Sequence, residues 1–224
     1  MTVVRRALAV LALGGLAPAA AAAPAGAATL QTDACVRYVA GQPTMTIVGT
    51  GFTPSGAVTL ASTTKAKPSP SPFASSPVLP NGGFATRTLP PAFSSPRRTL
   101  QSFTLVGLDT ANPAAFGTTP FQVVRFGLTT TPAPRRPTSR VTYTARGFET
   151  GKRVYVHFRY RGTTRRTVSL GLAKGPCGIA TRRMRALPTK ALYGSWTTYT
   201  NQSRRSARAL PYWRDSFTIF RRFG

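Results

Sequence analysis

Residues that support acid–base, nucleophilic or metal chemistry are scarce in this chain. Its 224 residues include one histidine and four carboxylates. A Ser-His-Asp arrangement can therefore be built only around His157, and a metal site would use nearly every candidate ligand. Glycosidase chemistry would need two paired carboxylates, and the only ones are Asp33, Asp109, Glu149 and Asp215. No Gly-x-Ser-x-Gly, phosphate-binding loop or Cys-x-x-Cys occurs. We therefore expect no enzyme, with no catalytic residue, no metal site and no cofactor.

Arginine is the abundant chemical group instead. Residues 125–224 hold 22 of the 30 lysines and arginines against two acids, a net charge of +20, whereas residues 29–124 carry only +4. Guanidinium groups match the geometry of phosphate, sulfate and carboxylate. Drift in a GC-rich genome would raise arginine in both halves, so the asymmetry favours binding. The predicted polyanion-binding residues are Arg159, Arg161, Arg165, Arg166, Arg182, Arg183 and Arg185.

Several partners are compatible with this charge. Outside a bacterial cell the common polyanions are cell-wall polymers, anionic lipid head groups and extracellular nucleic acid. An alternative function is a module that binds a small apolar ligand in a cleft at a sandwich end, near Trp196 or Trp213. An enzyme that uses His157 is the third hypothesis. The sequence leaves the oligomeric state open.

A repeat indicates which elements position these residues. Three sequence anchors occur twice in the same order, and this indicates one supersecondary plan used twice. Gly51–Val58 matches Gly147–Val154 at an offset of 96, Gly83–Arg87 matches Gly178–Arg182 at 95, and Phe121–Arg125 matches Phe217–Arg221 at 96.

Hydrophobic periodicity predicts strands throughout. Val154–Tyr160 alternates, with Val154, Val156, Phe158 and Tyr160 on one face. Thr167–Leu170 alternates again after Arg161-Gly162, which predicts a hairpin. The 20 prolines and 20 glycines would interrupt helices repeatedly. The predicted fold class is all-β, two tandem immunoglobulin-like β-sandwiches after a signal peptide.

The motif Gly-Phe-x-x-Gly-x-x-Val at 147–154, with its counterpart at 51–58, resembles the immunoglobulin-like domains of secreted bacterial proteins, including the neocarzinostatin group. The resemblance covers both repeats and implies a fold, with Phe52 and Phe148 closing a sandwich end. Domains of the neocarzinostatin group carry their own disulfides and a ligand cleft. Each repeat here has one cysteine, so neither feature carries over.

Four segments divide the chain. Residues 1–28 are predicted to be a signal peptide, because two arginines precede an apolar run and a stretch of small residues. Immunoglobulin-like domain 1 is expected at 29–128, a stiff proline-rich linker at 129–138 and the basic domain 2 at 139–224. Residues 65–72 predict an exposed polyproline-like loop. No later stretch is apolar over the roughly 20 residues that a transmembrane helix needs, so we expect a secreted protein, extracellular or associated with the cell wall.

The two cysteines fall at non-matching places in the repeats. Export exposes Cys35 and Cys177 to an oxidising compartment, which allows a bond between the two domains. Such a bond needs Cα atoms within about 7 Å. The sequence alone does not decide whether the two thiols meet.

Overall fold

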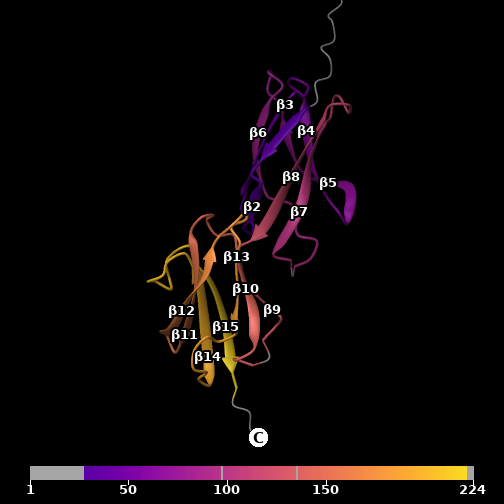
Figure 1. The fold of residues 1–224 in the computed structure, drawn as a ribbon. Coiled ribbons are helices and arrows are strands. Elements are labelled where there is room, and N and C mark those ends of the chain that lie inside the picture. The colour runs from indigo at the N-terminus through magenta and orange to yellow at the C-terminus, as the bar shows by residue number, and fades with distance from the viewer. Residues whose placement is uncertain (1–27, 97, 135, 221–224) are drawn as a thin grey trace, which may run out of the picture.

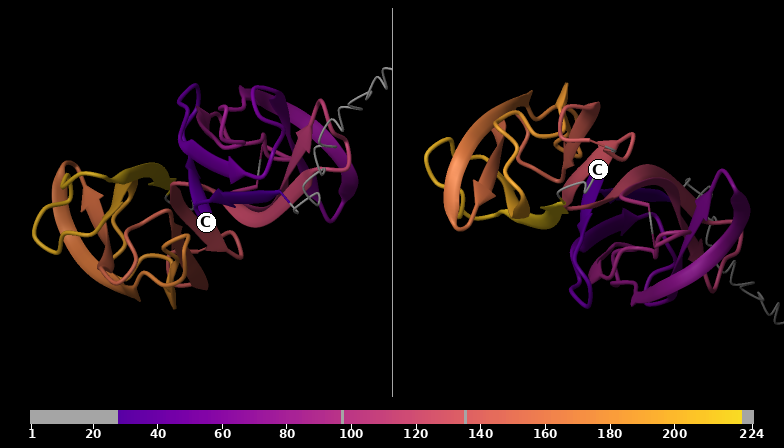
Figure 2. Two further views of the ribbon diagram at one scale, coloured as in Figure 1. Left: turned by 90° about the horizontal axis from the view of Figure 1, so that it is seen from above. Right: turned by 90° about the horizontal axis from the view of Figure 1, so that it is seen from below.

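A computed structural model describes residues 28–96, 98–134 and 136–220. The predicted signal peptide lies outside the described residues except for Ala28. The described chain forms strands β1 to β15 and two hydrophobic cores, which occupy separate lobes in every view (Figures 1 and 2). It includes no helix long and apolar enough to cross a membrane.

The amino-terminal unit, β1 to β8, packs a three-stranded sheet against a five-stranded sheet. The smaller sheet has the order β1 (Thr29–Thr32), β3 (Met45–Thr50) and β6 (Phe84–Thr88). The larger has the order β2 (Cys35–Tyr38), β8 (Phe116–Arg125), β7 (Leu100–Asp109), β4 (Ala57–Thr64) and β5 (Lys67–Pro77). Strand β2 runs parallel to β8, and the other pairs are antiparallel.

The carboxy-terminal unit, β9 to β15, repeats this arrangement without a counterpart of β2. Its smaller sheet has the order β9 (Gly127–Thr131), β10 (Arg140–Arg146) and β13 (Ala180–Arg185). Its larger sheet has the order β12 (Thr163–Leu172), β11 (Arg153–Tyr160), β14 (Gly194–Asn201) and β15 (Trp213–Ile219). The all-β class and the hairpin, now β11 and β12, are confirmed. The predicted apolar face is buried at Val154, Val156, Phe158 and Tyr160.

The structure corrects the middle anchor of the repeat by one residue. Phe52 N–H donates to the carbonyl of Gly82, and Phe148 N–H donates to that of Gly178, an offset of 96 in both partners. Gly82 and Gly178 both adopt positive φ. The sequence match at 95 paired Gly83 with Gly178 because both are glycines. The backbone shows that the equivalent residue is Gly82, whose close approach to Phe52 requires a glycine.

The repeat slips by three residues at one strand. Phe103 stacks on Phe121 at 5.6 Å, and Trp196 stacks on Phe217 at 6.4 Å, so β14 matches β7 at an offset of 93 while β15 matches β8 at 96. The slip places Gln202 where the amino-terminal unit has Asp109. Both side chains accept a hydrogen bond from the backbone of the Gly-Phe turn: Asp109 Oδ2 from Thr53 N and Gln202 Oε1 from Glu149 N.

The side chain of Asp109 is buried, and backbone N–H groups donate hydrogen bonds to its carboxylate. Burial acts to raise the pKa of Asp109, and hydrogen bonds from the backbone N–H groups of Thr53, Ala111 and Asn112 outweigh it, holding the pKa below its ordinary value. The donor–acceptor distances are 2.5 Å, 2.8 Å and 3.1 Å. The carboxylate therefore fixes the Gly-Phe turn and the loop after β7 together.

The predicted loop at 65–72 is instead mostly strand. Residues from Lys67 onward form β5 and pair with β4, with register shifts beside Ala61 and between Ser62 and Thr64. Proline lacks the N–H that a central strand needs, but β5 is the edge of its sheet, where proline is tolerated. The proline-rich composition therefore marks a sheet edge.

The predicted linker at 129–138 is also wrong in its first part. Thr129, Thr130 and Thr131 belong to β9 and pair with Thr144, Tyr143 and Thr142 of β10. These β-branched residues precede the first proline, so nothing prevents a ladder. Strand β8 ends at Arg125 and β9 begins at Gly127, so Phe126 alone separates the two units.

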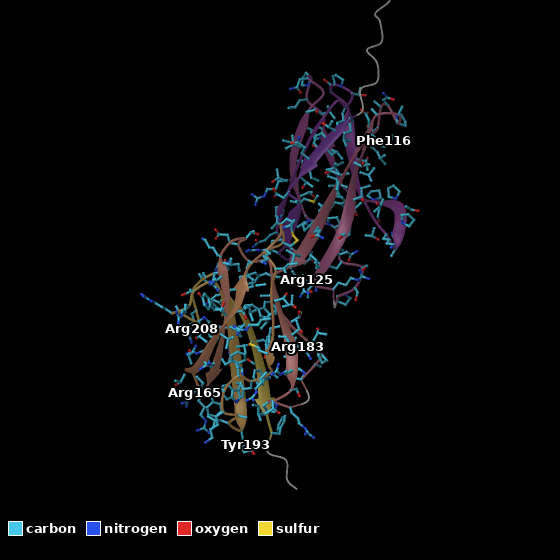
Figure 3. The ribbon with its side chains drawn as sticks, viewed as in Figure 1. Phe116, Arg125, Arg165, Arg183, Tyr193 and Arg208 are labelled. Carbon is cyan, nitrogen blue, oxygen red and sulfur yellow. A yellow bond between two sulfur atoms is a disulfide. The ribbon has the colours of Figure 1, made fainter. Side chains whose placement is uncertain are left out.

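Four contacts close the junction next to Phe126. Its ring packs against Phe148 at 4.6 Å, and the Arg37 guanidinium lies 5.0 Å from its ring centre while donating to the carbonyl of Gly147. Cys35 is bonded to Cys177, with Cα atoms 5.2 Å apart (Figure 3). Cys35 and Arg37 both lie on β2, so this short strand connects the amino-terminal unit to its neighbour.

We expect Gly178→Ala to destabilise the protein far more than Gly175→Ala. Both glycines adopt positive φ, which costs a side chain about 1 kcal/mol in either variant. A Cβ at Gly178 would overlap the Phe148 carbonyl, whereas a Cβ at Gly175 meets nothing within 4 Å. Denaturant unfolding of both variants measures the difference, and equal losses of stability would contradict the tight turn.

Asp109→Asn should remove a pH dependence of stability. Because the folded pKa lies below the unfolded value near 3.8, the ionised carboxylate stabilises the fold above that value. The stabilisation is lost as pH falls through the folded pKa. The difference in unfolding free energy between wild type and variant should therefore shrink from about pH 5 to about pH 2. A difference that stays constant over this range would show that Asp109 does not titrate in this way.

The disulfide should be detectable as protected cysteine. Alkylation of the purified protein without reductant should label neither thiol in mass spectrometry, and alkylation after reduction should label both. The bond joins residues that lie 142 positions apart in the sequence. The chain-entropy model therefore predicts that a Cys35→Ser, Cys177→Ser variant loses about 5 kcal/mol of unfolding free energy. Two labelled thiols in the unreduced protein would show that the disulfide is absent.

Candidate polyanion-binding surface and arginine hollow

The β11–β12 hairpin gathers the first group of predicted arginines. Arg161 and Gly162 form its turn with positive φ angles. The guanidinium carbons of Arg161 and Arg165 lie 5.3 Å and 5.9 Å from the centre of the Tyr160 ring. Tyr160 is itself fixed, because its hydroxyl donates to the Tyr193 carbonyl at 2.7 Å. Two exposed guanidinium groups thus share one aromatic ring at the end of the hairpin.

Arg159 belongs to a different environment from its neighbours. Its guanidinium carbon lies 5.4 Å from the Tyr199 ring centre on the outer face of the larger sheet, and the group donates to the Gly162 carbonyl. Arg214 approaches the same ring at 5.9 Å. Arg166 is exposed on β12, opposite Phe158. The structure therefore separates Arg159 from the exposed hairpin arginines.

Strand β13 supplies the second group. Arg183 and Arg185 are exposed and lie opposite Thr142 and Arg140 of β10. Arg182 turns toward the larger sheet and donates to the Ser169 carbonyl of β12 at 2.7 Å. The edges formed by β12 and β13 therefore meet at Arg182. Figure 3 locates Arg165, Arg183 and Arg208 on this unit and Arg125 near the junction.

Acidic side chains neutralise little of this charge. Among the described residues the single ion pair joins Lys152 to Glu149 at 2.7 Å, and both side chains are exposed. Asp215 Oδ1 accepts a hydrogen bond from the N–H of Ser216. Arg140 and Arg185 face each other across two strands without an acid between them in the register. Like charges so placed repel each other, so an anion from solution would relieve the repulsion.

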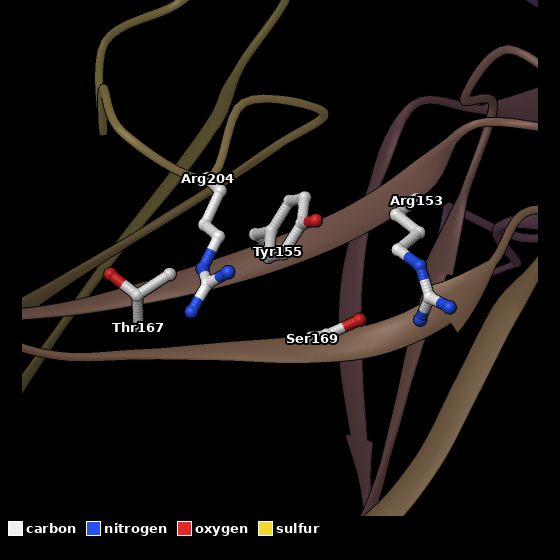
Figure 4. Close-up of a pocket in the computed structure, with 5 residues that line it drawn as sticks. All are labelled: Arg153, Tyr155, Thr167, Ser169 and Arg204. Atoms are coloured by element: carbon white, nitrogen blue, oxygen red, sulfur yellow. The ribbon is translucent and has the colours of Figure 1, made fainter.

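The structure also forms a hollow that sequence reasoning missed. A cavity of about 270 Å³ lies on the outer face of the larger sheet. It is lined by Arg153 and Tyr155 of β11, Thr167 and Ser169 of β12, and Arg204 of the segment after β14. Figure 4 shows Arg204 above Thr167, Arg153 beside Ser169, and Tyr155 between the two arginines. Arg204 comes from a chain segment that no periodicity assigned to this face, so the sequence carried no signal for the hollow.

The segment from Gln202 to Tyr212 folds back over the sheet to bring Arg204 there. The Asn201 amide donates to the Ser206 carbonyl at 2.8 Å, and Tyr199 packs on Tyr212 at 5.3 Å. Asn201 is fully buried beneath this segment.

His157 is a buried structural residue under this segment. Its Nε2 contacts Asn201 Oδ1 at 3.1 Å and the Ser203 carbonyl at 2.9 Å, and its Nδ1 contacts Thr167 Oγ1 at 2.9 Å. It is 1 % exposed. Both ring nitrogens are engaged, so the imidazole pins the segment to the sheet.

The tryptophans of the apolar-cleft hypothesis differ in position. Trp196 is fully buried, and its Nε1 donates to the Leu192 carbonyl at 2.9 Å. It therefore belongs to the core and lines no cleft. Trp213 is 38 % exposed and packs against Gly127 at the start of β9.

Comparison with known proteins yields fold-level likeness only. No family model matches the chain, and a search of curated proteins finds no significant match. Similar solved structures include Escherichia coli alpha-2-macroglobulin activated by porcine elastase, with 13% identity, a TM-score of 0.41, and coverage of 86% of this chain and 22% of the other. A tetra-tandem repeat in the extending region of a large adhesion protein has 13% identity, a TM-score of 0.26, and coverage of 86% and 49%. The Pseudomonas aeruginosa CupB2 chaperone has 12% identity, a TM-score of 0.29, and coverage of 85% and 100%.

The chain spans about a fifth of the macroglobulin's length. All three TM-scores are below 0.5, and we base no functional conclusion on them.

Proposed function

We propose that this protein is a secreted, non-enzymatic binding protein whose carboxy-terminal unit associates with an anionic polymer of the cell envelope. The amino-terminal unit, held at a fixed position by the junction, acts as a spacer. The cleft hypothesis is weaker, because Trp196 is inaccessible. The His157 hypothesis is weaker too, because both ring nitrogens are already bonded within the fold.

The observation that carries this proposal is that no exposed arginine among the described residues forms an ion pair with an acidic side chain. Arginines of the carboxy-terminal unit that do find partners bind backbone carbonyls, a threonine hydroxyl or aromatic rings: examples are Arg159, Arg182 and Arg146. None of these partners carries a charge, so the positive charge of the unit is retained. A retained field of this kind attracts polyanions and speeds their association.

The distribution of arginine over the fold supports a polymer over a small ion. Exposed arginines occur along β12, β13 and the segment after β14, so several are available to successive charges of one chain. A polymer that neutralises several cations at once releases several counterions, which gives strong binding at low salt. Lipid head groups and nucleic acid remain outcomes of the test below.

Binding to an immobilised phosphate polymer should weaken steeply between about 50 and 200 mM salt. Replacing Arg165, Arg166, Arg183 and Arg185 by glutamine should lower the elution salt and the slope of log affinity against log salt. A matched control replaces four cations of the amino-terminal unit, Lys65, Lys67, Arg87 and Arg98, by glutamine and loses the same charge.

The control should elute close to wild type. Equal shifts for the two variants would mean that net charge, and not this surface, determines binding. Retention on anionic vesicles or on DNA but not on the polymer would assign a different partner.

A further inference from the structure

The arginine hollow, defined above by Arg153, Tyr155, Thr167, Ser169 and Arg204, offers hydrogen-bond donors and positive charge. The guanidinium groups of Arg153 and Arg204 are exposed and make no hydrogen bond or ion pair within the described chain. The Tyr155 hydroxyl is also unpaired there. Ser169 Oγ accepts the N–H of Gly171 at 3.1 Å, which leaves its own proton free to donate.

The hydroxyl of Thr167 is committed to the fold. His157 Nε2 faces two acceptors, Asn201 Oδ1 and the Ser203 carbonyl, so in the neutral ring Nε2 carries the proton. Nδ1 is then an acceptor and receives the Thr167 hydroxyl. Thr167 therefore forms part of the floor, while Tyr155 and Ser169 remain the neutral donors.

The amino-terminal unit has the same pair of strands but no arginine at the position of Arg153, while Thr59 and Ser75 keep hydroxyl groups where the carboxy-terminal unit has Tyr155 and Ser169. At the repeat offset of 96, Ala57 stands in the place of Arg153 and Thr59 in that of Tyr155. Gln202 occupies the place of Asp109. Arg204 follows it in the segment where the offset changes from 93 to 96, so it has no fixed counterpart in the amino-terminal unit. The fold therefore does not require arginine at position 153.

We propose that the arginine hollow binds a phosphate monoester, with the phosphoryl group between Arg153 and Arg204 and accepting hydrogen bonds from Tyr155 and Ser169. Four donors with two positive charges suit a ligand made of acceptors. A phosphate monoester carries close to two negative charges and three terminal oxygens, whereas a diester carries one charge and two terminal oxygens. A carboxylate has only two oxygens for the four donors.

The lining residues of the hollow are grouped around a short span of two paired strands. Tyr155 and His157 lie two residues apart on β11, about 7 Å by the strand rise, and they pair with Ser169 and Thr167. The arginines stand over the two ends of this short span (Figure 4). Each guanidinium donates over about 2.8 Å to a phosphate oxygen, so long side chains from both ends can reach one tetrahedral ion.

This proposal rests on the proposed function, because it names the chemical group that the basic unit would recognise at the end of a polymer or on a lipid. The phosphate site differs from the proposed polymer-binding surface because it is confined to a few residues. General attraction depends on the total charge, whereas the hollow depends on two particular arginines and a tyrosine.

Titration of the full-length protein with methyl phosphate tests the proposal. Chemical-shift changes would be followed at pH 7.5 and constant ionic strength. Arg153→Gln with Arg204→Gln should weaken binding about tenfold or more, and Tyr155→Phe should weaken it several-fold. The matched control, Arg183→Gln with Arg185→Gln, removes the same charge outside the hollow and should change affinity less than about twofold. Thermal unfolding of the hollow variant should match wild type, because both side chains are exposed and unpaired.

Two further probes separate a phosphate site from a general anion site. Methyl sulfate and dimethyl phosphate, each with one charge, should bind several-fold more weakly than methyl phosphate. Methyl phosphate affinity should rise from pH 5 to 7.5 as the ester loses its second proton near pH 6, and methyl sulfate affinity should not. Equal loss in both double variants, or equal affinity for the three probes, would overturn the proposal.

The outcomes also distinguish this site from the polymer surface. If the hollow variant binds methyl phosphate more weakly than wild type but wild type does not bind the polymer, the phosphate site is supported and the proposed function is contradicted. If wild type binds the polymer but does not bind methyl phosphate, the phosphate site is contradicted and the proposed function is supported. Vesicles containing phosphatidic acid, compared with free methyl phosphate, show whether the phosphoryl group belongs to a lipid.

Discussion

The carboxy-terminal unit must accommodate a large positive charge almost without counter-charges. Its two acids cannot pair with the many arginines, so guanidinium groups find other partners: the rings of Tyr160 and Tyr199, and the carbonyls of Gly162 and Ser169. Where an arginine is half-buried without a carboxylate, burial lowers its pKa, as at Arg146. The strands can carry so much charge because most of it points outward, away from the core around Trp196. The same arrangement leaves that charge open to ligands.

The two units share a scaffold although their charges differ. The two units use the same turn, the same close approach of glycine to a phenylalanine carbonyl, and the same stacked aromatic pair between neighbouring strands. Even the polar contact to the Gly-Phe turn is retained with different chemistry, a carboxylate at Asp109 and an amide at Gln202. Fold and surface are therefore separable in this molecule. The same backbone position carries alanine at Ala57 and arginine at Arg153.

Much of the fold could be predicted from sequence, because it depends on local patterns. Alternation over Val154–Tyr160 and the Arg161-Gly162 turn sufficed for the hairpin. Proline-rich composition predicted a loop at 65–72 and a linker at 129–138, and both predictions failed in part. Prolines in Lys67–Pro77 are compatible with an edge strand, and the threonines at 129–131 pair with β10 before the first proline. The hollow could not be predicted, since Arg204 reaches it through a fold-back held by His157 and Asn201. The contact of His157 with the Ser203 carbonyl joins residues 46 positions apart and leaves no local trace in the sequence.

The covalent link between Cys35 and Cys177 has a mechanical consequence. The described chain begins at the far end of one lobe and finishes at the far end of the other (Figure 1), so tension between a surface and a tethered partner would pull along the long axis. A pulling force transmitted from residue 28 would bypass the enclosed 142-residue span through the sulfur bridge. The enclosed strands, which include most of the first lobe and the hairpin, would keep their length under load, and only the short leading segment and the strands after Cys177 could extend.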